Sequence, residues 1–285
     1  MKIGISIPPH MKEPERLFEW VRRVDAGPFS TLSILDRVVY ANYEPLLTLA
    51  AAAALSTRVR LMTEILLAPL RNTTVLAKQS ATLDALSRGR LTLGLGVGVR
   101  EDDFLATEAD YKRRGHHLEE QMVQMRSIWA GNALQANVGP VGPAPVQTQG
   151  PEILLGGFTK RAIQRVARSA DGFISALSQI EEIDTTFRRV EQSWHEAGRS
   201  GKPRLVAQMD MALEMHHIGQ GRNNVLDYYA TVPPFDTTKA ATLLTTEQQL
   251  RQTIHALQQI GTDELIFFTW STEFDQIDRV ADVIG

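Results

Sequence analysis

The sequence contains no cysteine, and this absence excludes several kinds of chemistry. A chain without thiols has no disulfide, no thiolate metal site, no iron–sulfur cluster and no cysteine nucleophile. An excess of charge of one sign is also absent, because 30 Lys and Arg residues stand against 33 Asp and Glu, for a formal net charge of −3. A chain without excess basic charge is not expected to bind nucleic acid through its phosphates.

Long hydrophobic runs are missing as well. The longest, Leu46 to Leu55, is typical of a buried helix and is far shorter than the roughly 18 residues of a membrane span. The first residues, MKIGISIPPH, are interrupted by two prolines and do not form the apolar core of a signal peptide. We therefore expect a soluble, cytoplasmic protein with no membrane partner.

Short β-like runs alternate with helical stretches from one end of the chain to the other. The expected strands are Lys2–Ile7, Thr31–Leu35, Val59–Ala68, Arg90–Val97, Glu152–Leu155, Phe173–Leu177, Arg204–Glu214 and Glu264–Thr269. Eight strands, most of them followed by a helix, predict an α/β protein with a single (β/α)8 TIM barrel spanning residues 1–285. An open doubly wound sheet is the alternative, but the first strand lacks the glycine-rich turn of a dinucleotide-binding half.

Several helix ends carry recognisable signals, and two segments look like short insertions. Asn72 or Thr73 caps a helix that ends at Gly89, and Thr246 with Gln249 forms a capping box. Residues 132–150 are rich in Gly, Pro and Gln and predict a surface excursion. Residues 215–245 contain scattered glycines and Pro233-Pro234, and predict an irregular insertion after the seventh strand.

In a barrel of this kind, the loops after the strands form the active site. The clearest local signal is Gly156-Gly157-Phe158-Thr159, which leads into a helix from Lys160. Two glycines allow the backbone to approach a ligand, and a helix N-terminus favours a phosphate. A tight turn without any ligand explains the same residues equally well.

Other candidate residues lie in or after the strands. Glu64 interrupts an apolar strand, so it needs either an ion-pair partner such as an arginine or a place facing a ligand. Arg37 and Arg100, both at strand ends, are candidate partners, anion contacts or rim charges. His10 follows the first strand and is a candidate acid or base, with a solvated loop histidine as the alternative. No His pair has the i, i+4 spacing of a zinc site, so no metal is expected.

Several segments taken together resemble the luciferase-like monooxygenases, a superfamily of flavin- and deazaflavin-dependent oxidoreductases. The resemblance is densest from Tyr43 to Phe104 and covers most of residues 1–176. The segments that carry it are Glu44-Pro-Leu-Leu-Thr-Leu-Ala, Pro69-Leu-Arg-Asn, Leu76-Ala-Lys-Gln-Ser-Ala-Thr-Leu-Asp, Ser87-Arg-Gly-Arg-Leu-Thr-Leu-Gly-Leu-Gly-Val-Gly, Ile153-Leu-Leu-Gly-Gly and Ala170-Asp-Gly.

The resemblance implies a flavin-type ring across the barrel mouth, with its phosphate at the glycine turn after the fifth strand. It also implies a bulge with a cis peptide bond at Glu64–Ile65, behind the ring. The cofactor contacts it implies are Asp36, Thr63, Glu64, Ile65, Val97, Gly98, Leu155, Gly156, Gly157 and Phe158. His10, Arg37 and Arg100 are the candidates for substrate or acid–base roles.

The resemblance predicts a monooxygenase that uses reduced FMN on a small organic substrate. Such an enzyme needs a separate flavin reductase as a partner, because nothing in the sequence resembles a nicotinamide-binding domain. The helix expected at Asn72–Leu86 is a candidate apolar interface for a homodimer. The alternatives are hydride transfer from the deazaflavin coenzyme F420, or a flavin-binding relative without turnover. Three departures from the family pattern motivate the last alternative. Arg37 replaces a frequent histidine, Glu64 replaces a small residue, and Val99 replaces an aromatic or acidic one.

Overall fold

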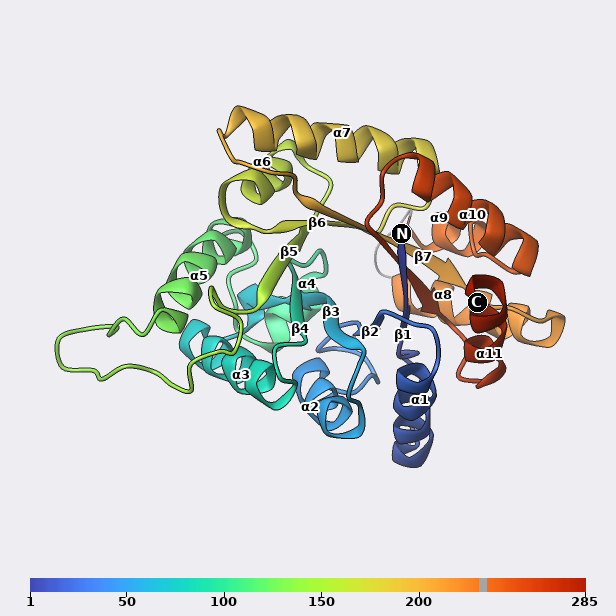
Figure 1. Ribbon diagram of the computed structural model, residues 1–285, viewed down its shortest axis with the longest axis horizontal. Coiled ribbons are helices and arrows are strands. Elements are labelled where there is room, and N and C mark those ends of the chain that lie inside the picture. Colours follow the sequence, from blue (N-terminus) through green and yellow to red (C-terminus); the bar gives the residue numbers. More distant parts are fainter. Residues whose placement is uncertain (231–234) are drawn as a thin grey trace.

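The computed structural model describes residues 1–230 and 235–285, and its eight parallel strands close into one barrel in sequential order (Figure 1). The last strand pairs with the first, with Lys2 opposite Glu264. The single (β/α)8 barrel predicted from the sequence is confirmed, and the open sheet is excluded. The strands are β1 (Lys2–Ser6), β2 (Thr31–Ile34), β3 (Arg60–Leu67), β4 (Leu91–Gly96), β5 (Glu152–Gly156), β6 (Gly172–Ser175), β7 (Arg204–Met211) and β8 (Glu264–Thr269).

Helices surround the barrel on its outside (Figure 1). They are α1 (Pro14–Ala26), α2 (Pro45–Leu55), the 3-10 helix η1 (Ala68–Leu70), α3 (Thr73–Leu86), α4 (Glu101–Ala106), α5 (Arg114–Trp129), α6 (Lys160–Ser169), α7 (Ile180–Glu196), α8 (Met215–Tyr229), α9 (Phe235–Ala241), α10 (Glu247–Gln259) and α11 (Asp275–Ile284). Within residues 1–230 and 235–285, no helix is both long and apolar enough to cross a membrane.

The predicted helix caps are present. Asn72 accepts a hydrogen bond from the Val75 N–H at 3.1 Å at the start of α3, and Gly89 follows that helix with a φ of +78°. Thr246 and Gln249 form the capping box of α10. A cap of this kind stabilises a helix by about 1 kcal/mol, because it satisfies backbone N–H groups that have no partner inside the helix.

The barrel interior is apolar in the middle and charged at one end. Its middle layer consists of the buried side chains of Met62, Leu154, Ile174, Val206 and Ile266. At the N-terminal ends of the strands, Arg204 forms ion pairs with Glu152 and the fully buried Glu264. This paired layer seals one end, so the interior opens toward the C-terminal ends of the strands.

The expectation for residues 215–245 is wrong in one respect, because most of the described part is helical. Helices α8 and α9 occupy this segment, and Gly221 lies inside α8. A Cβ at Gly221 would lie 2.5 Å from the Ala212 Cβ, so the glycine permits close packing of α8 on the barrel. Pro233-Pro234 lie outside the described residues. Residues 132–150 contain no helix or strand, and Figure 1 shows them projecting between α5 and β5.

Candidate active site

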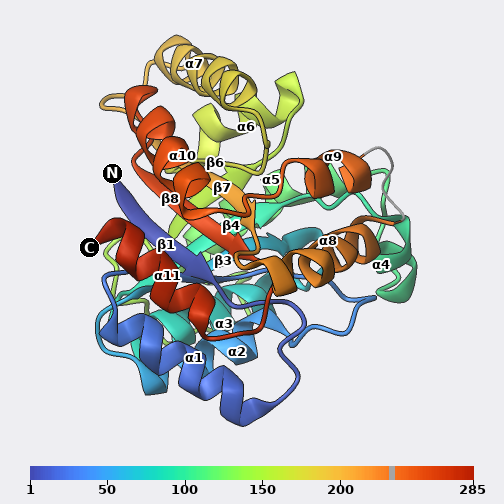
Figure 2. The same cartoon turned by 90° about the vertical axis from the view of Figure 1, so that its right-hand side faces the viewer.

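A cavity of about 730 Å³ lies at the C-terminal ends of the strands. Figure 2 shows α4, α8 and α9 gathered at this end of the barrel, away from the N-terminus of the chain. Residues from β3, β4, β5 and β7 line it, together with the loops that follow the strands and parts of α5, α6, α8 and α9. It therefore occupies the place where barrel enzymes carry their active sites.

A bulge in β3 supplies a flat apolar surface to this cavity. The register of β3 against β4 shifts between Thr63 and Leu66, and the Glu64–Ile65 peptide bond is cis, as the family resemblance implies. Ile65 packs against two glycines, Gly96 on the neighbouring strand β4 and Gly156 on β5. A Cβ at Gly156 would lie 2.4 Å from the Ile65 Cδ1, and one at Gly96 would lie 2.8 Å from the Ile65 Cγ2. The bare backbone at these two glycines thus leaves room for the side chain of Ile65 in the bulge.

Glu64 lies at the floor of the cavity with 3% of its surface exposed. The Ser33 hydroxyl donates a hydrogen bond to Glu64 Oε2 at 2.5 Å, whereas Glu64 Oε1 has no hydrogen-bond partner within residues 1–230 and 235–285. Burial raises the pKa of Glu64 well above its ordinary value, and the nearby carboxylates of Asp210 and Glu264 raise it further. Burial therefore favours the protonated, neutral form of the Glu64 carboxyl group.

A buried ion pair lies on the same floor. Lys239 on α9 contacts Asp210 on β7 with an Nζ–Oδ2 distance of 2.7 Å, and both side chains are at most 3% exposed. The indole N–H of Trp270 donates to the other oxygen of Asp210 at 2.9 Å. These contacts balance the charge of Asp210, so the Asp210–Lys239 pair carries no net charge.

The wall formed by α5 and α6 is positively charged. Lys112, Arg114 and Arg161 line the cavity and form no ion pair with any described residue. Arg165 on the same wall pairs with Glu119 at 3.0 Å. The first turn of α6 lies here, with Thr159 as its N-cap, and the free N–H groups of such a turn attract anions.

Ion pairs hold the rim of the cavity. Arg37 Nε donates to the buried Asp103 at 2.8 Å, and the Arg37 guanidinium lies 5.3 Å from the centre of the Tyr228 ring. Arg100 pairs with Asp102 and donates to the Tyr228 carbonyl at 3.3 Å. Both arginines therefore bind α4 to the end of α8, although both also line the cavity.

His10 lies beside the rim and is not among the residues that line the cavity. Its Nε2 is 2.8 Å from the Tyr40 hydroxyl, which donates to Asp227 at 3.0 Å. Partial burial lowers the pKa of His10 below its ordinary value, against the opposite effect of Asp227. The three side chains form a link between the β1 and β2 loops and α8.

Most residues named from the sequence line the cavity. These are Asp36, Arg37, Glu64, Ile65, Val97, Gly98, Arg100, Gly156, Gly157 and Phe158. Thr63 and Leu155 do not line it. The Thr63 hydroxyl donates to the Gly94 carbonyl, and Leu155 is packed in the hydrophobic core. Asp36 lines the cavity and also receives two hydrogen bonds from Arg71, at 2.6 and 3.0 Å.

The sequence interpretation missed several residues of this site. Lys239, Trp270 and Tyr229 come from the last third of the chain, and Lys112 and Arg161 come from the cationic wall. Gln208 also lies on the floor. The sequence pattern that singles out Glu64, a polar residue within a buried strand, is present at Gln208 as well. That signal could have identified it.

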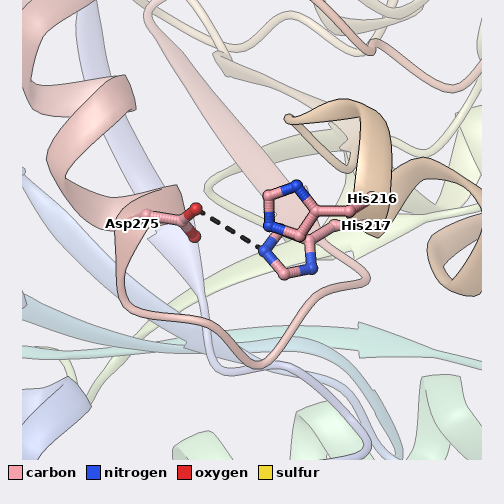
Figure 3. A group of neighbouring side chains, drawn as sticks. All are labelled: His216, His217 and Asp275. Atoms are coloured by element: carbon pink, nitrogen blue, oxygen red, sulfur yellow. Dashed lines mark ion pairs between the residues drawn. The ribbon is translucent and has the colours of Figure 1, made fainter.

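A separate group of polar side chains lies at the starts of α8 and α11 (Figure 3). His216, His217 and Asp275 place one ligand atom each within 4.8 Å of one another, with 3.6 Å between His217 Nε2 and Asp275 Oδ2. None of the three lines the cavity. The sequence spacing gives no sign of this cluster, because Asp275 is distant in the chain. The expectation that the protein binds no metal ion stays a prediction.

Comparison with known proteins agrees with this geometry. The family model described as luciferase-like monooxygenase matches residues 1–217, so the chain belongs to that family. An uncharacterised protein of Mycobacterium tuberculosis is 32% identical over 202 residues, which are 68% of this chain and 71% of that protein.

Two solved structures share the fold at low sequence identity. Monooxygenase RslO1 from Streptomyces bottropensis superposes with a TM-score of 0.78 at 21% identity, over 99% of this chain and 97% of that one. An F420-dependent secondary alcohol dehydrogenase, in complex with an F420-acetone adduct, gives a TM-score of 0.81 at 15% identity, over 99% of this chain and 98% of that one. The chain therefore has the fold of both a monooxygenase and an F420-dependent dehydrogenase.

Proposed function

We propose that this chain is an oxidoreductase that binds a flavin-type cofactor across the barrel mouth and acts on a small organic substrate. The observation that carries the proposal is the combination of three features in one cavity. These are the bare surface around Ile65, the cationic wall with the first turn of α6, and the enclosed polar floor at Glu64. A planar ring fits the first feature, a phosphate the second and a substrate the third.

Reduced FMN is the first candidate cofactor, with monooxygenation as its reaction. When bound, the cofactor supplies the redox chemistry, while the protein positions it and excludes water. Ile65 supports the ring, Arg161 and the first turn of α6 hold the phosphate, and α8 covers the mouth. A protein that uses FMN in this way needs a separate flavin reductase, because no segment of the sequence resembles a nicotinamide-binding domain.

One observation favours the deazaflavin coenzyme F420 as a second candidate, with hydride transfer as its reaction. The wall presents Lys112, Arg114 and Arg161 without ion-pair partners in the described part of the chain. A single phosphate monoester does not require that many cations. Coenzyme F420 carries a phosphodiester and glutamate carboxylates, so its extended anionic tail matches the wall more closely.

The first experiment is to titrate the purified protein with FMN and with coenzyme F420, each oxidised and reduced, and to follow the spectrum of the ring. We expect one of them to bind with a micromolar dissociation constant. Gly156→Ala fills the surface beside Ile65 and should abolish this binding, whereas Gly139→Ala, at a position with open space around it, should not. Binding of neither cofactor by the wild-type protein would contradict the proposal.

A homodimer remains part of the proposal. Leu47 on α2 and Val75 and Leu86 on α3 are 72%, 53% and 59% exposed, which is unusual for large apolar side chains on neighbouring helices. Exposed apolar side chains on two packed helices favour association with another protein surface. Sedimentation analysis of the wild-type protein and of Leu47→Glu tests it, because the charge should dissociate the dimer.

A further inference from the structure

The histidine cluster, which consists of His216, His217 and Asp275, is formed by the starts of two helices that follow different strands (Figure 3). Both histidines lie in the first turn of α8, after β7, and Asp275 is the first residue of α11, after β8. The fully buried Gln276 joins the two segments, because its amide accepts a hydrogen bond from the Leu213 N–H at 2.8 Å and donates one to the Leu213 carbonyl at 3.1 Å. The two helix starts are therefore held together by contacts outside the cluster itself.

The two imidazole rings of the cluster lie together although their residues are adjacent in the chain. Adjacent residues on a helix direct their side chains roughly 100° apart. The rings of His216 and His217 nevertheless have their centroids 3.8 Å apart, with 52° between the ring planes. The other adjacent pair, His116 and His117, also lies near a carboxylate, that of Glu120. Within residues 1–230 and 235–285, only the histidine cluster brings three possible metal-ligand atoms within 4.8 Å of one another.

Asp275 turns one carboxylate oxygen toward the histidines and is held by the other. Its Oδ1 accepts a hydrogen bond from the Gln276 amide at 3.1 Å, and its Oδ2 lies 3.6 Å from His217 Nε2. Arg279, one turn further along α11, forms an ion pair with Glu214 instead. No Lys or Arg in the described part of the chain pairs with Asp275, so its charge is available to a metal ion. Hydrogen bonds that orient a carboxylate in this way are typical of metal sites.

We propose that the histidine cluster binds a zinc ion, with two imidazole nitrogens and one carboxylate oxygen as ligands and water in the fourth position. Zinc accepts this mixture of ligands in tetrahedral geometry at about 2.0–2.2 Å, which places the ligand atoms about 3.4 Å apart. The distance of 3.6 Å between His217 Nε2 and Asp275 Oδ2 is close to that spacing. His216 is exposed, so its ring can turn toward the ion from solvent. Magnesium and calcium ions prefer oxygen ligands and fit this site poorly.

This inference goes beyond the proposed function, because none of the three side chains lines the cavity. The expectation that the protein binds no metal ion rested on the spacing of histidines along the chain, whereas this cluster is formed between α8 and α11. A zinc ion joins the first turns of these two helices, and the other end of α8 lines the cavity with Tyr228 and Tyr229. The ion therefore has a structural role, in which it fixes the start of α8.

Isothermal titration calorimetry tests the site on the full chain without a histidine tag, after treatment with EDTA and removal of the chelator. We expect one Zn²⁺ per chain with a micromolar dissociation constant, and no binding of Mg²⁺ under the same conditions. His217→Ala and Asp275→Asn should each weaken zinc binding by at least about tenfold, because each removes one of three protein ligands. His116→Ala, in the other adjacent pair, is the matched control and should bind zinc as the wild-type protein does.

Hydrogen exchange provides a second measurement, which locates the bound ion. Zinc should slow the exchange of amides in the first two turns of α8 and α11 in the wild-type protein but not in His217→Ala, since an ion bound to the folded state suppresses local opening. Absence of zinc binding, unchanged affinity in both ligand variants, or a loss of affinity in His116→Ala alone would overturn the inference. Zinc binding without this local protection is adventitious and overturns it as well. None of these outcomes depends on the titrations with FMN and coenzyme F420.

Discussion

The wall and the floor of the cavity handle charge in opposite ways. On the wall, Lys112 and Arg161 are exposed and have no ion-pair partner among the described residues. On the floor, Lys239 is paired with Asp210, and burial raises the pKa of Glu64, which favours its neutral form. Solvent screens the charges on the wall, so leaving them unpaired costs little folding free energy, and they can attract an anion. A buried charge, in contrast, is stable only when it is paired.

This difference suggests how one cavity distinguishes two molecules. In the proposed function, the anionic tail of the cofactor is attracted to the wall, whereas the cation on the floor, Lys239, is already paired with Asp210. A neutral substrate, in the same proposal, gains nothing from the charge of the wall. Breaking the neutrality of the floor or the charge of the wall should therefore have separate effects.

The largest effect is expected from Lys239→Met, which leaves Asp210 charged and buried without its cation. Removing one partner of a buried pair costs about 3–5 kcal/mol, so the free energy of unfolding should fall by that amount. Urea denaturation measures it. Lys112→Met, the matched change on the exposed wall, should alter stability by less than about 0.5 kcal/mol. Similar losses for both variants would show that the floor and the wall do not differ as described.

The second effect is a change in the pH dependence of stability in Glu64→Gln. The raised pKa of Glu64 means that the folded protein keeps a proton which the unfolded chain releases above about pH 4.5. The wild-type protein should therefore lose stability as the pH rises above that value, by at most about 1.4 kcal/mol per pH unit for this group. Glutamine does not titrate, so the variant should gain stability relative to wild type between pH 5 and 8.

Urea denaturation at several pH values between 5 and 8 provides this measurement. The exposed Glu182→Gln is the control, because its stability difference from wild type should stay constant with pH. A constant difference for Glu64→Gln as well would mean that Glu64 is ionised in the folded protein.

The third effect concerns the wall. Arg161→Ala should weaken cofactor binding by roughly tenfold, and high salt should reduce the difference between the variant and wild type. Arg168→Ala is the control on the same helix, because Arg168 pairs with Glu119 at 3.1 Å and does not line the cavity. If both variants bind equally weakly, the general charge of α6 matters and the wall does not contact the cofactor.

The sequence was sufficient for the barrel and for one half of the site. Alternating apolar residues and the glycine or proline stops define strands locally, and Gly156-Gly157 marks, in one short segment, a turn that lines the cavity. The floor is different, because Lys239 and Asp210 meet only through the packing of α9 on the barrel. No local pattern encodes that meeting.

Charged residues on helix faces are also difficult to interpret without a structure. Arg161 and Arg168 lie on one helix and have the same chemistry, yet only Arg161 faces the cavity. Helix α8 was missed for a related reason, since Gly219 and Gly221 are typical of loops, and only the close approach of Gly221 to Ala212 explains a glycine inside that helix.

The smallest effect is expected outside both the wall and the floor, at the link between His10, Tyr40 and Asp227. Tyr40→Phe removes a hydroxyl that contacts His10 at 2.8 Å and Asp227 at 3.0 Å, and it should lower the free energy of unfolding by about 1 kcal/mol. Because His10 does not line the cavity, cofactor affinity should be unchanged in the same titration used for Arg161→Ala. A loss of affinity as large as that of Arg161→Ala would mean that the position of α8 over the mouth controls binding. Cofactor affinity would then depend more on the position of α8 than on the difference in charge between the wall and the floor.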